Sequence, residues 1–288
     1  MKTYNIRNVL VPIDSQLVSI DNLQVALSVC TQQAAMLTLI RIVNGYYTLF
    51  PSEPGSFYSD FLPELLVRTE RSLATIANDL HAEYGVSVDW VVRLGDPEEE
   101  ISNCAREAKI DLIIMQSRAV SPLRKFILGS SLTRIVQNAP CPVMTVPQHR
   151  HFLGFKKILF PVRVVTHALD KYVAIWPFIK KNESSLLIVG IASKSTPTEF
   201  RPVGQLVETI SHQMIEDHVT CENEMHYCDS PAQQVLDIAN LERPDLIVIT
   251  ATQESSSFRS LFNSTYTDEI VNHAQFSVLS IRPDFVAN

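Results

Sequence analysis

Residues 111–117, Asp-Leu-Ile-Ile-Met-Gln-Ser, are followed by Gly129-Ser130-Ser131 and by Pro-Val-Met-Thr-Val at 142–146, and the same order returns later in the chain. The second copy reads Asp-Leu-Ile-Val-Ile-Thr at 245–250, then Asn263-Ser264-Thr265, then Ser-Val-Leu-Ser-Ile at 277–281. In each copy a buried strand leads through a polar loop to a small-residue turn, which opens a helix before a final strand. This order is typical of a βαβ unit whose helix N-terminus can hold a phosphate. The chain is therefore predicted to contain one domain twice.

Apolar runs and helical periodicity predict five strands in each half, with helices between them. The predicted strands are 8–13, 36–43, 86–92, 111–115 and 143–146, then 157–162, 186–191, 219–227, 245–249 and 278–281. The predicted helices include 20–34, 63–82, 97–108 and 204–217, and one that Ser230-Pro231 opens. Strands separated by helices pair in parallel, and strands that are apolar on both faces need helices on both sides. We therefore expect an α/β fold of two tandem doubly wound five-stranded parallel sheets, Rossmann-like, in domains 1–149 and 150–288.

Two constant offsets relate the copies. Matching residues lie 149 positions apart up to the second strand and 134 apart after it, as in the pairs Pro12 and Pro161, Val43 and Ala192, Pro97 and Pro231, and Gly129 and Asn263. The difference of 15 residues predicts a longer loop at about 44–62 in the first copy. That loop is rich in aromatic residues: Tyr46, Tyr47, Phe50, Phe57, Tyr58 and Phe61. It is predicted to form either a lid or partner surface, or a segment pinned to its own domain.

Composition limits the classes of function. The net charge of -7 argues against nucleic-acid binding and adsorption to anionic lipid. No leading apolar segment and no apolar run of about 18 residues is present, which predicts a cytoplasmic protein without membrane insertion. The five cysteines are odd in number and scattered, so they are predicted to be reduced thiols.

Several stretches resemble the universal stress protein family. They are the strand that ends Val-Pro-Ile-Asp14, the Gly95-Asp-Pro turn, the Asp-Leu-Ile-Ile strand, Arg124-Lys-Phe-Ile-Leu-Gly-Ser-Ser131 and Ala-Pro-Cys-Pro-Val143. The resemblance covers nearly the whole chain as a tandem pair and implies the adenine nucleotide alpha hydrolase-like fold. It also implies a nucleotide motif, G-x2-G-x9-G-[ST], whose positions fall on Gln116, Ala119, Gly129 and Ser130. The candidate binding residues are Pro12, Asp14, Val43, Gln116, Ala119, Gly129, Ser130 and Ser131.

Two of the three motif glycines are therefore replaced in the first copy. Glycine lets a backbone approach phosphate oxygens closely, whereas Gln116 and Ala119 bring side chains. The helix N-terminus at Gly129-Ser130-Ser131 keeps free N–H groups, so ATP or AMP stays a candidate ligand here. The alternative is that Ser130 only caps this helix, with Arg118, Arg124 and Lys125 forming a solvated loop beside it.

The second copy is predicted to have lost the nucleotide site. Arg163 stands where the first copy has Asp14, Thr250 and Gln253 replace the first two glycines, and Asn263 replaces Gly129. An acidic group has thus become a cation, and the anion-binding turn has gained a side chain.

Two further groups of residues are candidates for metal binding or for a reactive thiol. The segment 212–228 contains three histidines and two cysteines, which are residue types that bind zinc: His212, His218, Cys221, His226 and Cys228. However, His212 and His218 are six positions apart on a predicted helix and therefore lie on different faces. No C-x2-C or H-x3-H pair occurs in this segment. Surface histidines and core thiols are the alternative. Cys141 is predicted to be buried at the start of a strand rather than reactive. No metal site and no catalytic residue is assigned.

The sequence thus predicts a cytoplasmic stress-response binding and regulatory protein without catalysis. One alternative is an ATP- or AMP-dependent switch or slow ATPase that uses Asp14, Gly129 and Ser130; another is a carrier of a small apolar or acyl ligand under the aromatic loop. The resemblance also implies that the last strands, 142–146 and 277–281, pair with each other, so that one chain imitates a homodimer. A further dimerisation of the whole chain does not follow from the sequence.

Overall fold

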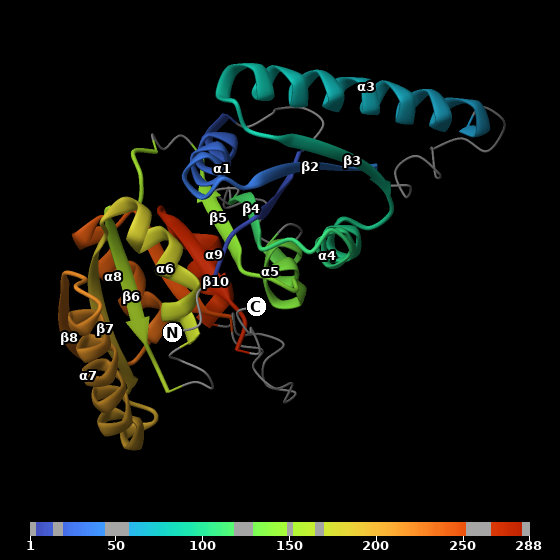
Figure 1. Ribbon diagram of the computed structural model, residues 1–288. Coiled ribbons are helices and arrows are strands. Elements are labelled where there is room, and N and C mark those ends of the chain that lie inside the picture. The colour runs from blue at the N-terminus through green and yellow to red at the C-terminus, as the bar shows by residue number, and fades with distance from the viewer. Residues whose placement is uncertain are drawn as a thin grey trace.

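Ten strands form one continuous sheet in the order β3-β2-β1-β4-β5-β10-β9-β6-β7-β8 (Figure 1). The computed structural model describes residues 4–13, 20–43, 58–117, 129–148, 152–164, 170–251 and 266–283. The strands of the first half are β1 (Asn8–Pro12), β2 (Met36–Val43), β3 (Val88–Leu94), β4 (Leu112–Ser117) and β5 (Val143–Pro147). Those of the second half are β6 (Lys157–Val162), β7 (Ser185–Ser193), β8 (Cys221–Cys228), β9 (Leu246–Thr250) and β10 (Ser277–Ile281).

The two halves join through their last strands. All other neighbours are parallel, but β5 and β10 pair antiparallel, with Val143, Met144 and Thr145 opposite Ser280, Leu279 and Val278. The internal pairing predicted for these strands is confirmed. The expected two sheets are therefore one ten-stranded sheet, because the antiparallel seam satisfies the edge that each half would otherwise leave open. The division between residues 149 and 150 stays a prediction, with five strands on either side of it.

Helices cover both faces of the sheet, as predicted. Their bounds are α1 (Ile20–Gln33), α3 (Tyr58–Tyr84), α4 (Pro97–Glu107), α5 (Gly129–Asn138), α6 (Asp170–Asn182), α7 (Phe200–Glu216), α8 (Pro231–Glu242) and α9 (Tyr266–His273). Buried side chains of α1, α3, α6 and α7 share one hydrophobic core with the strands, and those of α4, α5, α8 and α9 share the other. Each core spans both halves, so the sheet is the common wall between two layers.

Hydrogen bonds between α1 and α6 reinforce the seam on one face. The Gln32 side chain exchanges hydrogen bonds with the Asn182 side chain at 3.3 and 3.4 Å, and Gln33 Nε2 donates to the Pro177 carbonyl at 3.0 Å. Asn182 also accepts the N–H of Phe155 and donates to the Phe178 carbonyl. Because Asn182 is buried, these contacts satisfy polar atoms that would otherwise destabilise the junction.

The duplication extends to the helix ends. Ala34 and Glu183, 149 positions apart, both adopt positive φ (54° and 50°) after helices α1 and α6. Lys109 and Arg243, 134 positions apart, both have φ of 47° after α4 and α8. Asp96 and Ser230, again 134 apart, cap α4 and α8 through side-chain oxygens that accept backbone N–H groups. The same offsets therefore recur in the backbone geometry as well as in the sequence.

The aspartates that begin the repeated motif have a structural role. Asp111 Oδ2 accepts the N–H groups of Arg7 and Asn8 at 2.8 and 2.9 Å, and Asp245 Oδ2 accepts those of Lys156 and Lys157 at 2.9 Å each. Each carboxylate thereby ties the start of β4 or β9 to the start of β1 or β6. Hydrogen bonds of this kind to a charged acceptor are among the stronger ones in proteins.

Replacing Asp111 with alanine should therefore lower the free energy of unfolding by about 1–3 kcal/mol, since two backbone donors lose a charged acceptor. Urea denaturation of both proteins would measure this. The matched control is Asp79→Ala on the exposed face of α3, which should change stability by less than about 0.5 kcal/mol. Equal losses in the two variants would contradict the role of Asp111 as a clamp.

The largest differences from the predicted boundaries lie around α3. The helix begins at Tyr58 rather than at 63, so Tyr58 and Phe61 belong to a helix and not to a loop. Proline is commonest in the first turn of a helix, but Pro63 lies inside α3. The strand that follows runs from Val88 to Leu94 instead of 86–92, because its pairing continues to the end of β2 at Val43. The rest of the aromatic loop lies outside the described residues.

Candidate functional site

The candidate residues of the first half gather where three neighbouring strands end. Pro12 ends β1, Val43 ends β2 and Gln116 lies near the end of β4, and these strands are adjacent in the order β2-β1-β4. The strand order reverses at β1, which is where doubly wound sheets bind ligands. Val43 is buried, while Pro12 and Gln116 are partly exposed. The structure therefore brings these three residues to one edge of the sheet, and their role in binding stays a prediction.

A glycine turn holds the next strand at the same edge. Gly95, with φ of 153°, donates its N–H to the Val43 carbonyl at 3.2 Å. A Cβ on Gly95 would lie 3.0 Å from the Glu100 side chain, in a backbone conformation that other residues rarely adopt. Asp96 then caps α4 by accepting the N–H groups of Glu98 and Glu99 at 2.9 and 3.2 Å.

One expectation for this edge is wrong and one is confirmed. Gln116 was expected in the loop after the fourth strand, but it still belongs to β4, paired with Val146 of β5. Gln116 is therefore a strand residue beside the crevice. Helix α5 begins at Gly129, so the helix N-terminus predicted at this small-residue turn is confirmed, with Ser130 and Ser131 in the first turn. Asp14, Ala119 and the side chains of Ser130 and Ser131 lie outside the described residues.

The corresponding edge of the second half is lined by this half's own side chains. The Arg163 guanidinium carbon lies 4.3 Å from the centre of the Tyr266 ring, a cation–π arrangement. Lys171 on α6 donates to the Pro161 carbonyl, and its amine lies 4.4 Å from the centre of the Phe160 ring. Together with Thr250 at the end of β9, these residues surround a cavity of about 10 Å³. That volume holds one water-sized particle, and the described residues leave no space for a nucleotide between them.

Burial governs the electrostatics here. Burial and the nearby Arg163 cation lower the pKa of Lys171 from 10.5 to about 7. Burial raises the pKa of Tyr266 well above its ordinary value, with Arg163 acting in the opposite direction. Both effects follow from removing the charged form of each group from water.

Lys171 and Tyr266 were not among the predicted site residues. Lys171 had a sequence signal, because it lies in helical register with the apolar residues Ala174, Ile175 and Phe178, all of which are buried. A lysine on an apolar stripe indicates a buried amine. Tyr266 had no such signal, since its contact with Arg163 spans about a hundred residues of chain.

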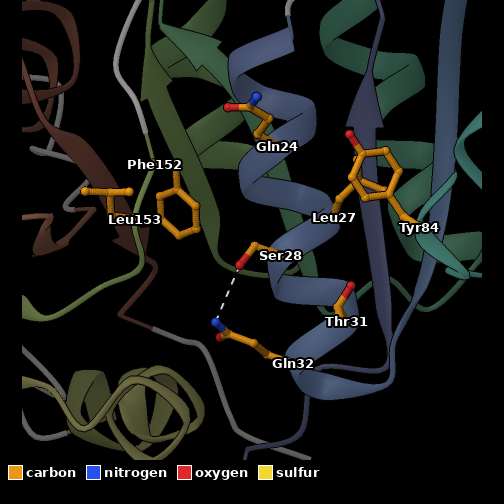
Figure 2. A pocket seen from close by; sticks show the side chains of 8 residues that line it. All are labelled: Gln24, Leu27, Ser28, Thr31, Gln32, Tyr84, Phe152 and Leu153. Atoms are coloured by element: carbon orange, nitrogen blue, oxygen red, sulfur yellow. Dashed lines mark hydrogen bonds between the residues drawn. The ribbon is translucent and has the colours of Figure 1, made fainter.

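A larger hollow lies away from both edges. A groove of about 590 Å³ runs along α1. Figure 2 shows Tyr84 of α3 on one side of this helix and Phe152 and Leu153 on the other. The lining residues of the groove are Gln24, Leu27, Ser28, Thr31, Gln32, Tyr84, Phe152 and Leu153. Gln32 precedes β2, Tyr84 precedes β3 and Leu153 precedes β6, so the groove lies toward the edge where the strands begin. It is therefore distinct from the crevice at the strand ends.

The His/Cys segment 212–228 does not converge. His218 lies beyond the end of α7, with φ of 60°, so the expectation that it shares a helix with His212 is wrong. His226 instead contacts Glu224 on β8, at 3.0 Å between Nε2 and Oε1. Within the described part of the chain, no group of three or more His, Cys, Asp or Glu side chains is arranged to hold a metal ion. Cys141 is buried, as predicted, and burial raises the pKa of its thiol.

None of the described helices combines the length and the apolar character that a membrane span requires. Similarity of fold extends over the whole chain. A universal stress protein from Archaeoglobus fulgidus superimposes with a TM-score of 0.73 at 14% identity, covering 98% of each chain. A functionally unknown protein from Pseudomonas aeruginosa PAO1 gives a TM-score of 0.64 at 18% identity, covering 97% of this chain and 93% of that one. At such identities the likeness concerns the fold.

Sequence similarity identifies the family. Residues 5–147 match the model of the universal stress protein family. The universal stress protein YxiE of Bacillus subtilis is 30% identical over 142 residues, which are 48% of this chain and 96% of that protein. A universal stress protein of Methanocaldococcus jannaschii is 28% identical over 141 residues, or 49% of this chain and 81% of its own length. This chain belongs to the universal stress protein family.

Proposed function

We propose that the protein is a cytoplasmic binding and regulatory protein of the stress response, and that it works without catalysis. The first half supplies a ligand crevice at the ends of β2, β1 and β4. The second half is a permanently attached partner with a different crevice, joined through β5 and β10. Family membership supports the stress-response role, and the binding role rests on the sites themselves.

The observation that carries the proposal is the asymmetry between the two crevices. In the second half, Arg163 replaces an aspartate and stacks on Tyr266, and the remaining cavity measures about 10 Å³. A nucleotide does not fit the space that the described residues leave there. In the first half, two motif glycines are replaced, which weakens the contacts that a backbone makes with phosphate. Both features favour a protein that senses or binds without turning over ATP.

Nucleotide titration followed by thermal denaturation tests this proposal. A ligand at 100 times its Kd stabilises a protein by about 2.7 kcal/mol, so a genuine nucleotide switch would show a clear rise in Tm. We expect ATP, ADP and AMP at millimolar concentration to give no such rise, and ATP to yield no phosphate above background. A saturable rise that Asp14→Ala abolishes and Arg163→Ala leaves intact would overturn the proposal in favour of an ATP- or AMP-dependent switch.

The groove along α1 favours a second candidate, the binding of a small and partly apolar ligand. Its volume falls in the range of small-molecule sites, and Leu27, Phe152 and Tyr84 offer apolar surface beside the polar Gln24 and Thr31. Native mass spectrometry of the purified protein should then reveal a bound small molecule. Leu27→Gln should reduce its occupancy, whereas Leu241→Gln, on a distant exposed site of α8, should not. A bare protein mass in every preparation would count against this candidate.

A further inference from the structure

The small cavity of the second half is surrounded by groups from five segments. Pro161 belongs to β6, Arg163 follows that strand, Lys171 lies on α6, Thr250 ends β9 and Tyr266 begins α9. The sheet and its two helical layers thus hold two cationic side chains and a hydroxyl around a space of about 10 Å³. Such convergence from separate elements is what a preformed site for a small ligand requires.

Lys171 is the most buried cation at this site. Its side chain is 3% exposed, and one N–H of its amine is used by the Pro161 carbonyl. Neither Lys171 nor Arg163 forms an ion pair with an acidic side chain among the described residues. A buried positive charge without a negative partner is costly, so an anion placed beside it would stabilise the folded protein.

Thr250 supplies an independent indication of a ligand. Its side chain is 6% exposed, it lines the cavity, and its hydroxyl has no hydrogen-bond partner in the part of the chain that the structure describes. Buried hydroxyls are nearly always satisfied, and each exception calls for an explanation. A hydroxyl can donate to an anion in the cavity, which would satisfy it.

The size of the cavity selects the class of anion. A space of this volume accepts one particle of about the size of a water molecule. Phosphate, carboxylates and nitrate contain several heavy atoms and exceed it, whereas a halide ion is only slightly larger than water. We propose that the cavity formed by Arg163, Lys171, Thr250, Tyr266 and Pro161 is a halide site, with chloride as its ligand in the cell.

Protonation of Lys171 strengthens this site. The other titratable groups around the cavity are Arg163 and Tyr266, and Cys228 lies close enough to influence the pKa of Tyr266. Burial and then Asp229 raise the pKa of Cys228, so at pH 6 this thiol is neutral and places no negative charge beside the anion. Because Lys171 is more fully protonated at pH 6 than at pH 9, halide binding should be tighter at the lower pH.

Thermal denaturation at constant ionic strength tests the proposal, with NaCl, NaBr, sodium nitrate or sodium acetate replacing sodium gluconate. At pH 6 we expect chloride and bromide to raise the Tm by roughly 2–4 °C in a saturable manner, with a smaller rise at pH 9. The rise should disappear in Lys171→Met and shrink in Thr250→Val, and it should persist in the control Lys180→Met, which changes an exposed lysine of the same helix. A crystal soaked in bromide should show an anomalous scattering peak in the cavity.

Three outcomes would overturn the proposal. Identical Tm values in all five salts would mean that the cavity binds no anion more tightly than gluconate. A chloride effect that survives in both Lys171→Met and Thr250→Val would place the anion elsewhere. An equal or larger effect of nitrate or acetate would contradict the size argument. Thr250→Val keeps nearly the same shape as the native side chain, so the test does not depend on the folding of Lys171→Met.

Discussion

Replacement of Gly190 by alanine is expected to destabilise the protein by about 2–3 kcal/mol, the upper part of the range for overpacked cores. Gly190 lies in β7, under helix α7. A Cβ at this position would lie 2.1 Å from the sulfur of Met225, 2.9 Å from Val207 and 3.1 Å from Val203. The two valines are buried on α7, so they cannot yield without moving the helix away from the sheet.

Replacement of Gly204 by alanine provides a matched control, because its expected effect on stability is opposite to that of Gly190→Ala. It lies in the interior of α7, and a Cβ there would meet nothing within 4 Å. Alanine is favoured over glycine inside a helix by about 1 kcal/mol, so Gly204→Ala should stabilise the protein by up to that amount. Urea denaturation, followed by the fluorescence of Trp176 in a Trp90→Phe background, would report on the second half specifically. Destabilisation by both substitutions, or by neither, would contradict the close approach of α7 to β7.

The order of strands and helices is predictable from this sequence because each signal is local and appears twice. The apolar strand at 245–249 and the helix start at Ser230-Pro231 each rest on neighbouring residues, and the offsets of 149 and 134 residues show that the same local signals occur in the other half. The pairing of β5 with β10 follows from the resemblance to the family. The start of α3 is not predictable from local signals, because Pro63 lies inside this helix, whereas proline usually occupies the first turn of a helix.

The candidate site is less predictable, because its decisive contacts are not local. The alignment of the two copies places Arg163 at the position of Asp14, but it does not predict what the Arg163 side chain contacts. Its partner is the Tyr266 ring, about a hundred residues later, and the buried Lys171 comes from a third element. Conversely, a repeated motif does not always mark a binding residue. Asp111 and Asp245 belong to the repeated motif, yet their carboxylates hold the starts of neighbouring strands together.

Lys171→Met is expected to remove a strong pH dependence of stability above neutral pH. In the folded protein, burial first and Arg163 second lower the pKa of Lys171 to about 7, whereas a lysine in an unfolded chain keeps its proton up to about 10.4. Between these values the unfolded chain binds about one more proton, so the free energy of unfolding rises by about 1.4 kcal/mol per pH unit. This gain in the free energy of unfolding is complete above the pKa that Lys171 has in the unfolded chain, and it is lost as the pH falls to about 7. Methionine has a similar length but no titrating group.

The stability difference between the wild type and Lys171→Met should therefore shift by roughly 2 kcal/mol in favour of the wild type from pH 7 to pH 9. Below pH 7 the variant should be the more stable protein, since the wild type then buries a charged amine beside Arg163. Urea denaturation in gluconate buffers, without halide, measures the difference at each pH, and titrations common to both proteins cancel. Lys180→Met, an exposed change on the same helix, should follow the wild type at every pH. A constant difference across this window would mean that Lys171 stays charged in the folded protein, which requires a negative partner beside its amine at all pH values.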